Sequence, residues 1–556
     1  MIAGLIPLIV LGGIVFIIAS LARRRGDGPP PGGGFSVRRL FVYLLGFAAL
    51  LVGAIGMVEL LAIAFGSGGD RVGAEIASPL AMTVVGLPVF ALLGRWVLAT
   101  HSADPTEAGS VAWALYLNAT LVLSVSLVVV HAFDATEGLV AWEWHAEGVA
   151  GLLVWAAVWA SHWRVWRRIQ PVLFPFLHMW LASAVGLWVL GAAVAFFVDD
   201  VVRRFFPAPD GLVIAPDSRD MWLAATGIVI GGAVWGWHWL GHGLGSTRSE
   251  GWYAYVLLLG VMVGLIATVV AAGLLVFLVL EWFLGSPGMS AVDHFREVAP
   301  ALGLGTVGLA SWRYHRGVLG ASARRDRNEI DRIYDYIVTG VGLGTVSVAF
   351  AILVLAVFDA LAPASVVDER VGGDVLLTAI TLLVVGVPMW AVTWRRVQRL
   401  ATQNHGEVES VTRRVYLYAV FGVGAAVAFG ALISLLVVVF RALFEEVVDE
   451  AMVRQIDMPV ALLLTTGVSS MYHWLVYRSE REVETRAPRR AVMLVAGGDV
   501  DIEEIEERAN VRVRLLRRSD GAGGDVGAIV RAIDSAVGSH LVVIVEPGEV
   551  TAIPYE

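Results

Sequence analysis

The sequence contains no cysteine and no lysine, so its 40 lysine-or-arginine positions are all arginine. Without cysteine, disulfide frameworks, thiolate metal sites, iron–sulfur clusters and cysteine nucleophiles are excluded. Without lysine, Schiff-base chemistry and the lysine of a phosphate-binding P-loop are excluded as well. These absences remove several classes of enzyme before any motif is considered.

Charged residues are also scarce: they make up 16% of the 556 residues, against roughly 25% in an ordinary soluble domain. The chain is 57% hydrophobic and its mean hydropathy is +0.74. Apolar runs of about 20 residues, the length that crosses a bilayer, recur through most of the chain, and only its last part reads as soluble sequence. The sequence therefore predicts an all-α polytopic membrane bundle with a small C-terminal α/β domain.

The first apolar run, residues 2–20, is followed by Arg23, Arg24 and Arg25. A cleavable signal peptide has the opposite order, so residues 1–21 are predicted to form a transmembrane anchor and residues 22–39 a cytoplasmic linker. Twelve further spans are predicted, which brings the total to about 13, at 40–65, 78–96, 111–132, 148–166, 172–198, 221–240, 252–283, 298–314, 333–358, 373–394, 415–440 and 458–477.

Arginine distribution gives the expected orientation. Threading the spans alternately places most arginines on one side and acidic loops on the other, which predicts a multi-pass protein of the cell (inner, cytoplasmic) membrane. The N-terminus is then outside and the C-terminal domain, residues 488–556, is cytoplasmic.

Aromatic residues mark six helical hairpins. Outward helices begin with pairs such as Phe41 and Tyr43, and returning helices end with tryptophan, at Trp96, Trp163, Trp239, Trp312, Trp394 and Trp474. This spacing indicates an internal repeat, with hairpins 1–2 at 40–170, hairpins 3–4 at 171–320 and hairpins 5–6 at 330–480. Two interpretations stay open: a lipid-facing interfacial belt, and a ring of aromatic and histidine side chains around a pseudo-symmetric centre.

The stretches VVGLPVFALLGRW at 84–96 and VVGVPMWAVTWRR at 384–396 are each followed by a polar linker and a new helix. On these residues the chain resembles the bacterial membrane family catalogued as domain of unknown function 5671, most clearly over hairpins 1–2 and 5–6. The resemblance implies tandem copies of a four-helix unit, with hairpins 3–4 as a diverged middle copy that lacks the proline of Pro88 and Pro388. The family has no established activity, so no mechanism is implied.

Ionisable residues inside a bilayer are costly and mark ion or substrate pathways. Glu59 is the one carboxylate well inside a predicted span, and it is interpreted either as a proton or cation site or as an interfacial carboxylate. His238 and His242 lie four residues apart on one helix face. They are weak metal candidates, because a third ligand would have to come from another helix.

The outer loop DATEGLVAWEWHAEG contains Glu143, His145 and Glu147, with His131 just before it. Carboxylates with histidine bind divalent ions, and tryptophans can hold a quinone, pigment or sugar. An acidic outer loop beside interfacial tryptophans is also what membrane topology alone produces. The loop is therefore a candidate site with a plain structural alternative.

The C-terminal region predicts strand (AVMLVA), helix (IEEIEERA), strand (VRVRLL), helix (VGAIVRAIDSAV) and two closing strands (LVVIVE, VTAIPY). The second helix is expected to bury Val526, Ile529, Val530, Ile533 and Val537 against a sheet. Arginines on the second strand form a basic edge that could meet anionic lipid or a protein.

No metalloprotease, nucleophile-elbow or phosphate-loop motif is present, which favours a non-enzymatic role without deciding it. The leading hypothesis is a membrane platform or assembly subunit whose cytoplasmic domain binds or senses a partner. The alternative is a transporter or channel for a small or apolar solute, regulated by that domain. The expected partners are the lipid bilayer and a protein at the C-terminal domain. Nucleic acid is not expected, and the cofactors are unknown, with none required by the sequence.

Overall fold

The computed structural model describes residues 37–66, 73–206, 218–285, 287–320, 329–361, 371–403, 405–408, 410–445, 450–484, 490–497, 500–518, 524–538, 540–546 and 548–555. The predicted anchor at 1–21, and the linker at 22–39 apart from its last three residues, lie outside this part of the chain. The chain divides into two compact bodies, Met1–Val397 and Gln398–Glu556.

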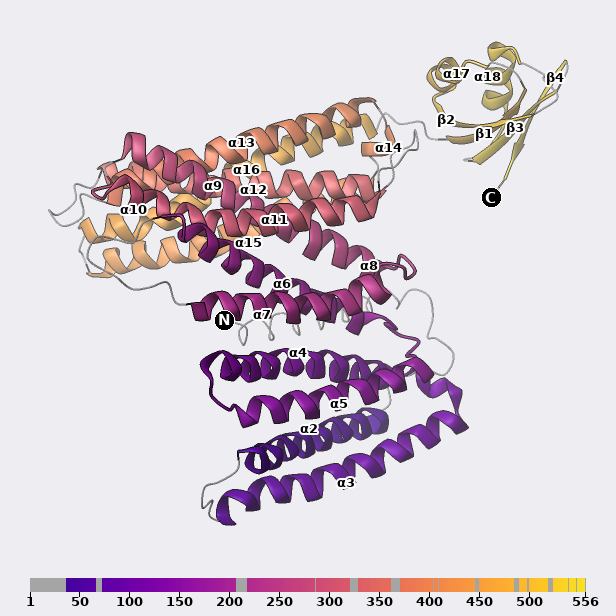
Figure 1. Ribbon diagram of the computed structural model, residues 1–556. Helices are drawn as coiled ribbons and strands as arrows, with labels where there is room; N and C mark the ends of the chain where they lie inside the picture. The colour runs from indigo at the N-terminus through magenta and orange to yellow at the C-terminus, as the bar shows by residue number, and fades with distance from the viewer. Residues whose placement is uncertain are drawn as a thin grey trace. The chain divides into compact units, whose positions relative to one another are not determined.

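The first body consists of long helices joined by short segments (Figure 1). Its elements are α2 (Val37–Phe65), α3 (Gly73–Ala103), η3 (Pro105–Gly109), α4 (Val111–Ala141), α5 (Ala146–Arg168), α6 (Leu177–Arg203), α7 (Ser218–Trp235), η4 (Gly236–Gly243), α8 (Glu250–Ala254), η5 (Tyr255–Met262), α9 (Val263–Leu284), α10 (Ala291–Arg296), α11 (Val298–Leu319) and α12 (Glu329–Leu361). Helix α13 (Val371–Gln403) crosses the boundary, and α14 (His405–Val408), α15 (Val411–Glu445) and α16 (Glu450–Glu484) belong to the second body.

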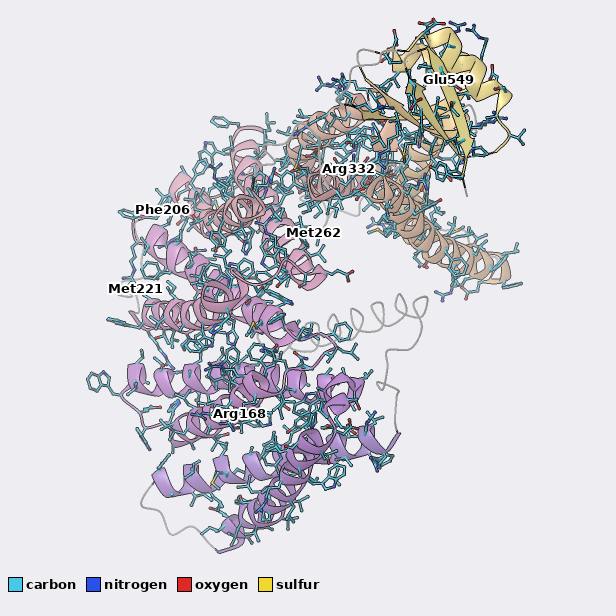
Figure 2. The ribbon with its side chains drawn as sticks, turned by 90° about the vertical axis from the view of Figure 1, so that its right-hand side faces the viewer. Arg168, Phe206, Met221, Met262, Arg332 and Glu549 are labelled. Atoms are coloured by element: carbon cyan, nitrogen blue, oxygen red, sulfur yellow. The ribbon has the colours of Figure 1, made fainter. Side chains whose placement is uncertain are left out.

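Consecutive helices pack as hairpins: α2 against α3, α4 against α5, α6 against α7, α9 against α11, and α15 against α16. In Figure 2, Phe206 and Met221 mark the end of α6 and the start of α7 on the same side of the helices. We call α2–α5 the first repeat, α6–α11 the middle repeat and α12–α16 the last repeat.

Glycine allows the closest helix approach in the first repeat. A Cβ added at Gly86 of α3 would overlap the backbone of Gly53 in α2. Small residues at such crossings let two helix backbones approach within van der Waals contact, which is the main source of helix association in lipid.

Eleven of the twelve predicted spans lie within helical structure, and the remaining one, 172–198, begins five residues before α6 starts at Leu177. Among the described residues, nine helices are long and apolar enough to cross a membrane: Arg38–Phe65, Glu75–Ala103, Val111–Ala141, Leu177–Arg203, Arg219–Gly243, Glu250–Leu284, Glu329–Phe358, Val375–Gln403 and Val411–Glu445. The chain is thus a helical protein with membrane-spanning segments. Helices α5, α11 and α16 are not among the nine.

Two segments of the middle repeat are π-helical, η4 and η5. A π-helical turn is wider than an α-helical turn, so it shifts the following side chains around the helix axis, and such turns are frequent at functional sites. The prediction of ordinary spans at 221–240 and 252–283 did not anticipate them, because periodicity does not distinguish a local π-turn from a continuous α-helix.

The C-terminal domain is a four-stranded sheet in the order β2-β1-β3-β4, with β1 (Arg490–Ala496), β2 (Val511–Arg517), β3 (His540–Glu546) and β4 (Glu549–Pro554). Strand β1 pairs in parallel with β2 and β3, and β4 closes the sheet in antiparallel. Helices α17 (Ile502–Ala509) and α18 (Val526–Ser535) contact each other and cover one face of the sheet (Figure 1).

The core of this domain is formed by alternate strand residues such as Leu494 and Val543, packed against Ile505, Ile529 and Ile533 of the two helices. The predicted strands and helices are therefore confirmed. Val537 is a correction: it is 86% exposed, because α18 ends at Ser535 and Ala536 is already extended.

Candidate functional site: three tyrosine–histidine pairs

Eight aromatic side chains are buried in one cluster among the described residues, which we call the aromatic layer: Tyr43, Trp113, Trp163, Trp166, Trp180, Trp239, Trp252 and Tyr255. They come from the starts of α2, α4, α6, α8 and η5, from the end of α5 and from η4, which alternating helices bring to one end of the bundle. Trp239 is fully buried, whereas Trp96 and Trp474 are 45% and 43% exposed. The belt interpretation therefore describes Trp96 and Trp474 but not the aromatic layer.

In the first repeat, Tyr116 of α4 meets His162 of α5. The His162 Nδ1 lies 2.8 Å from the Val158 carbonyl oxygen, which can only accept, so this nitrogen carries the proton of the neutral ring. The Nε2 is then an acceptor, and the Tyr116 hydroxyl donates to it over 2.9 Å. The Tyr116 hydroxyl and both ring nitrogens of His162 are therefore hydrogen-bonded inside the bundle.

In the middle repeat, Tyr255 of η5 and His315 of α11 have a ring-centroid distance of 5.7 Å, close to the 5.8 Å of Tyr116 and His162. His315 Nδ1 likewise donates to a backbone carbonyl, that of Ser311. The Tyr255 hydroxyl instead accepts from the Trp235 indole over 2.8 Å. His315 is fully buried and its Nε2 has no hydrogen-bond partner.

In the last repeat, Tyr416 of α15 and His473 of α16 have the same ring-centroid distance of 5.8 Å. His473 Nδ1 donates to the Ser469 carbonyl, and the Tyr416 hydroxyl lies 3.5 Å from His473 Nε2. The tautomer argument therefore applies to all three histidines. The tyrosine hydroxyl lies against the histidine Nε2 in the first and last repeats, and only in the middle repeat does it bind Trp235 instead.

The sequence contains a signal for these pairs that the aromatic pattern alone did not reveal. Each tyrosine lies six residues after a serine, in the stretches SVAWALY, SEGWYAY and SVTRRVY that start at Ser110, Ser249 and Ser410. The Ser110 and Ser249 hydroxyls cap their helices by accepting from the amides of Trp113 and Trp252. The serine thus marks the start of the helix, and the tyrosine of each pair follows it at a fixed distance. The position of the partner histidine depends on tertiary packing.

Asn118 joins the first repeat to the middle repeat. Its Oδ1 accepts from the backbone amide and the Nδ1 of His178, over 2.8 and 3.0 Å. Its Nδ2 donates to the carbonyls of Ala114 and Phe174. Every polar atom of this buried amide is satisfied, so Asn118 fixes the start of α6 against α4, while His178 Nε2 has no partner.

The structure places His238 and His242 both against Trp163, with ring centroids 6.0 and 5.2 Å from the Trp163 ring. His238 is buried and its Nδ1 donates to the Val234 carbonyl, while His242 is exposed. Within the described part of the chain, no group of three histidine or acidic side chains could hold a metal ion. The pair therefore gains no third ligand there.

The stretch DATEGLVAWEWHAEG, which joins α4 to α5, brings part of its predicted residues together. His145 Nδ1 lies 2.9 Å from Asp134 and its Nε2 lies 3.8 Å from Glu143. The hydrogen bond and the charge of Asp134 raise the pKa of His145. Glu147 is exposed, and His131 is half-buried lower on α4, against Gly151 of α5.

Glu59 is an exposed residue of α2. Several buried hydroxyls in the predicted spans, such as those of Thr120, Ser124 and Ser126, donate to carbonyls four residues earlier in their own helix, whereas the hydroxyls of Ser183 and Thr381 have no partner among the described residues. The paired hydroxyls are satisfied locally and do not line a polar path.

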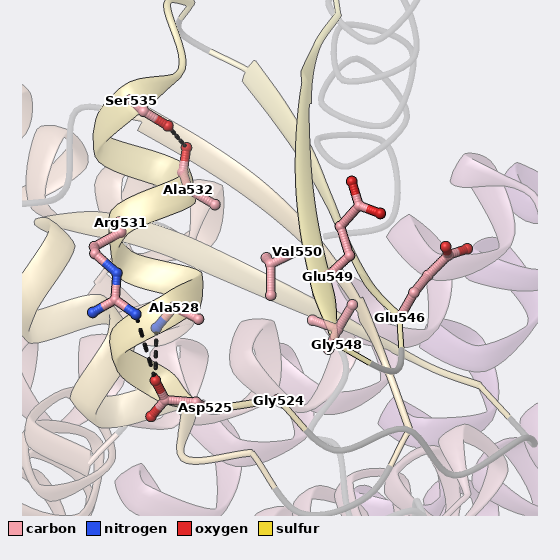
Figure 3. A pocket seen from close by; sticks show the side chains of 11 residues that line it. Gly524, Asp525, Ala528, Arg531, Ala532, Ser535, Glu546, Gly548, Glu549 and Val550 are labelled. Atoms are coloured by element: carbon pink, nitrogen blue, oxygen red, sulfur yellow. Dashed lines mark hydrogen bonds and ion pairs between the residues drawn. The ribbon is translucent and has the colours of Figure 1, made fainter.

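A cleft of about 610 Å³ lies in the C-terminal domain between α18 and the β3–β4 turn (Figure 3). Asp525 caps the amide of Ala528 and pairs with Arg531, and Ser535 donates to the Ala532 carbonyl. Glu546 and Glu549 extend away from α18 in Figure 3. The polar groups near α18 thus bind one another, and the cleft presents few free polar groups to a ligand.

The face of the sheet opposite α17 and α18 is apolar, and no described helix of the domain covers it. We call it the open face and define it by Met493, Val495, Leu516, Val542, Ile544 and Ile553, which share one side by strand alternation. Leu516 and Ile553 are 42% and 47% exposed. Arg512 and Arg514 lie on the same face at the β2 edge.

No curated protein and no solved structure matches the chain. The model of the family described as Domain of unknown function (DUF5671) matches residues 39–144 and 332–468. The first stretch contains α2–α4 and the second contains α12, α13, α15 and the first part of α16. The predicted resemblance is confirmed: the family model matches the chain twice, once in the first repeat and once in the last.

Proposed function

We propose that this protein is a non-enzymatic membrane platform whose C-terminal domain binds a protein partner. The observation that carries the proposal is the open face. Parallel sheets are normally covered on both faces, and an exposed apolar patch with a polar rim is typical of an interaction surface. A domain attached directly after α16 would hold such a partner at the membrane.

The topology proposed with this function has about 13 spans, the N-terminus outside and the C-terminal domain in the cytoplasm of the inner membrane. The arginine distribution supports it. The aromatic layer would then lie toward the cytoplasmic side, where the packing of its buried rings rigidifies the platform.

Mass spectrometry of the full chain extracted in native lipid discs tests the proposal. We expect a stoichiometric protein partner with the full chain, and its loss from a variant lacking residues 490–556. A chain that carries no protein but a specific small molecule would contradict the platform.

A transporter or channel is the second candidate, and one observation favours it. His178, His238 and His315, all of the middle repeat, are buried with an unpaired Nε2, and unsatisfied polar groups in a membrane interior mark substrate or proton pathways. Proteoliposomes with an entrapped pH dye test this role. Proton flux that is lost in His315→Leu and kept in the lipid-facing variant Trp96→Leu would favour transport over the platform.

A further inference from the structure

No described helix of the domain covers the open face, although parallel strands are usually covered by helices on both faces. Strands β2, β1 and β3 are parallel, and both connections place their helices on the same face. Leu494 and Val543 are fully buried beneath those helices, whereas Met493 and Val542, one residue away on the same strands, remain partly exposed. Helices are the usual second layer on a parallel sheet.

Charge on the open face is divided between its ends. Arg514 pairs in register with Met493, and Arg512 with Ala491, so the β2 edge is basic. Glu546 and Glu549 pair in register at the β3–β4 turn, and Arg518 lies 3.7 Å from Glu546, so the far corner keeps an excess of acidic charge. An anionic lipid surface would meet both ends at once and be repelled at the turn. A narrow occupant can lie over the apolar rows and touch the arginines alone.

Resting on the proposed function, we propose that this occupant is an amphipathic helix of the partner protein, with its apolar side on Met493, Val542 and Ile553 and acidic residues beside Arg512 and Arg514. A seven-residue strand is about 23 Å long, which a helix of about 15 residues covers. Such a helix presents apolar residues at every third or fourth position and carboxylates along one flank.

In-cell photo-crosslinking of the full chain tests the inference. A photoreactive amino acid replaces Ile553 on the open face or, as the matched control, exposed Ser535 at the end of α18. We expect a protein adduct from position 553 only. Mass spectrometry of the crosslinked peptide should find apolar residues at helical spacing with acidic residues on one flank.

Charge reversal provides the second measurement. Arg514→Glu should lower the adduct yield about tenfold, because it replaces an attraction with a repulsion. Arg508→Glu, on the exposed side of α17 where Arg508 pairs with Glu504, is the matched control and should leave the yield unchanged. Equal thermal unfolding of the two variants would show that the domain remains folded.

The outcomes separate this inference from the proposed function. Protein adducts at position 535 but not at 553 would overturn the inference and leave the platform standing. Adducts with lipid or with a second copy of this chain at position 553 would also overturn the inference that a partner helix binds there. Adduct yields unaffected by Arg514→Glu would overturn it as well. No protein adduct at either position would count against the platform itself.

Discussion

In the first repeat the Tyr116 hydroxyl donates to His162, whereas in the middle repeat the Tyr255 hydroxyl accepts from Trp235 and His315 keeps an unpaired Nε2. The ring-centroid distances differ by only 0.1 Å between the two pairs. Helix packing therefore sets the distance between the rings, and a neighbouring indole decides the hydrogen bond.

Trp235 and Trp96 explain why the neighbour differs. Each lies 14 residues before the capping serine of its repeat, Ser249 or Ser110. Trp96 faces outward, but Trp235 is half-buried and reaches Tyr255. The π-helical η4 follows Trp235 directly, and its wider turn changes the relation between this face of α7 and the next helix.

The largest expected effect on stability concerns the aromatic layer, which contains Tyr255 and against which Tyr116 packs. Trp239→Ala should lower the free energy of unfolding by about 3 to 5 kcal/mol, because a buried indole leaves a cavity. Trp239 also donates to the Tyr314 hydroxyl over 3.0 Å. Thermal unfolding of the full chain in lipid discs measures this loss. Trp96→Ala is the exposed control, and an equal loss there would contradict a buried layer.

Overpacking the middle pair should have the next largest effect. A Cβ added at Gly260 would overlap the His315 ring, so Gly260→Ala should cost about 1 to 3 kcal/mol of unfolding free energy. Nothing lies within 4 Å of a Cβ at Gly46, so Gly46→Ala is the control. The unfolding midpoints of the two variants measure this cost. Equal midpoints would show that the His315 ring can move away from the added methyl group freely.

Removing the tyrosine hydroxyl sharpens the contrast between repeats. Tyr116→Phe leaves the buried His162 Nε2 without a donor and should cost about 1 to 3 kcal/mol. Tyr255→Phe leaves His315 as it is and unpairs only the half-buried Trp235 indole, so it should cost less. Chemical unfolding compares the two variants, and a greater cost for Tyr255→Phe would reverse the assignment.

The smallest expected effect concerns the connection between α4 and α5 in the first repeat. Because Asp134 raises the pKa of His145, the pair stabilises the fold fully below the ordinary histidine pKa of about 6.5, and this contribution disappears as pH rises through the raised value. The stability difference between the parent and Asp134→Asn should therefore be present at acidic pH and vanish at alkaline pH. A difference that grows with pH would contradict the pairing.

Much of the fold was readable from particular residues. Within the described part of the chain, the apolar runs that predicted spans form helices, although the run at 172–198 becomes helical only at Leu177, and AVMLVA, VRVRLL and LVVIVE form the three parallel strands. Val537 was misjudged, because helical spacing continues in the sequence beyond the residue where the helix ends. The histidine partners were not predicted, since they lie 46 to 60 residues from their tyrosines and only packing joins them.

The sequence by itself determined the membrane-protein class, the two matching domains and the order of elements, because these depend on composition, local periodicity and short motifs. The tertiary structure alone decided that the tryptophans of the aromatic layer turn inward, that Tyr255 binds Trp235 in place of His315, and that one face of the C-terminal sheet is open. These features depend on how helices rotate and cross and on which face each connection covers, and such relations between distant segments are not encoded in any local pattern.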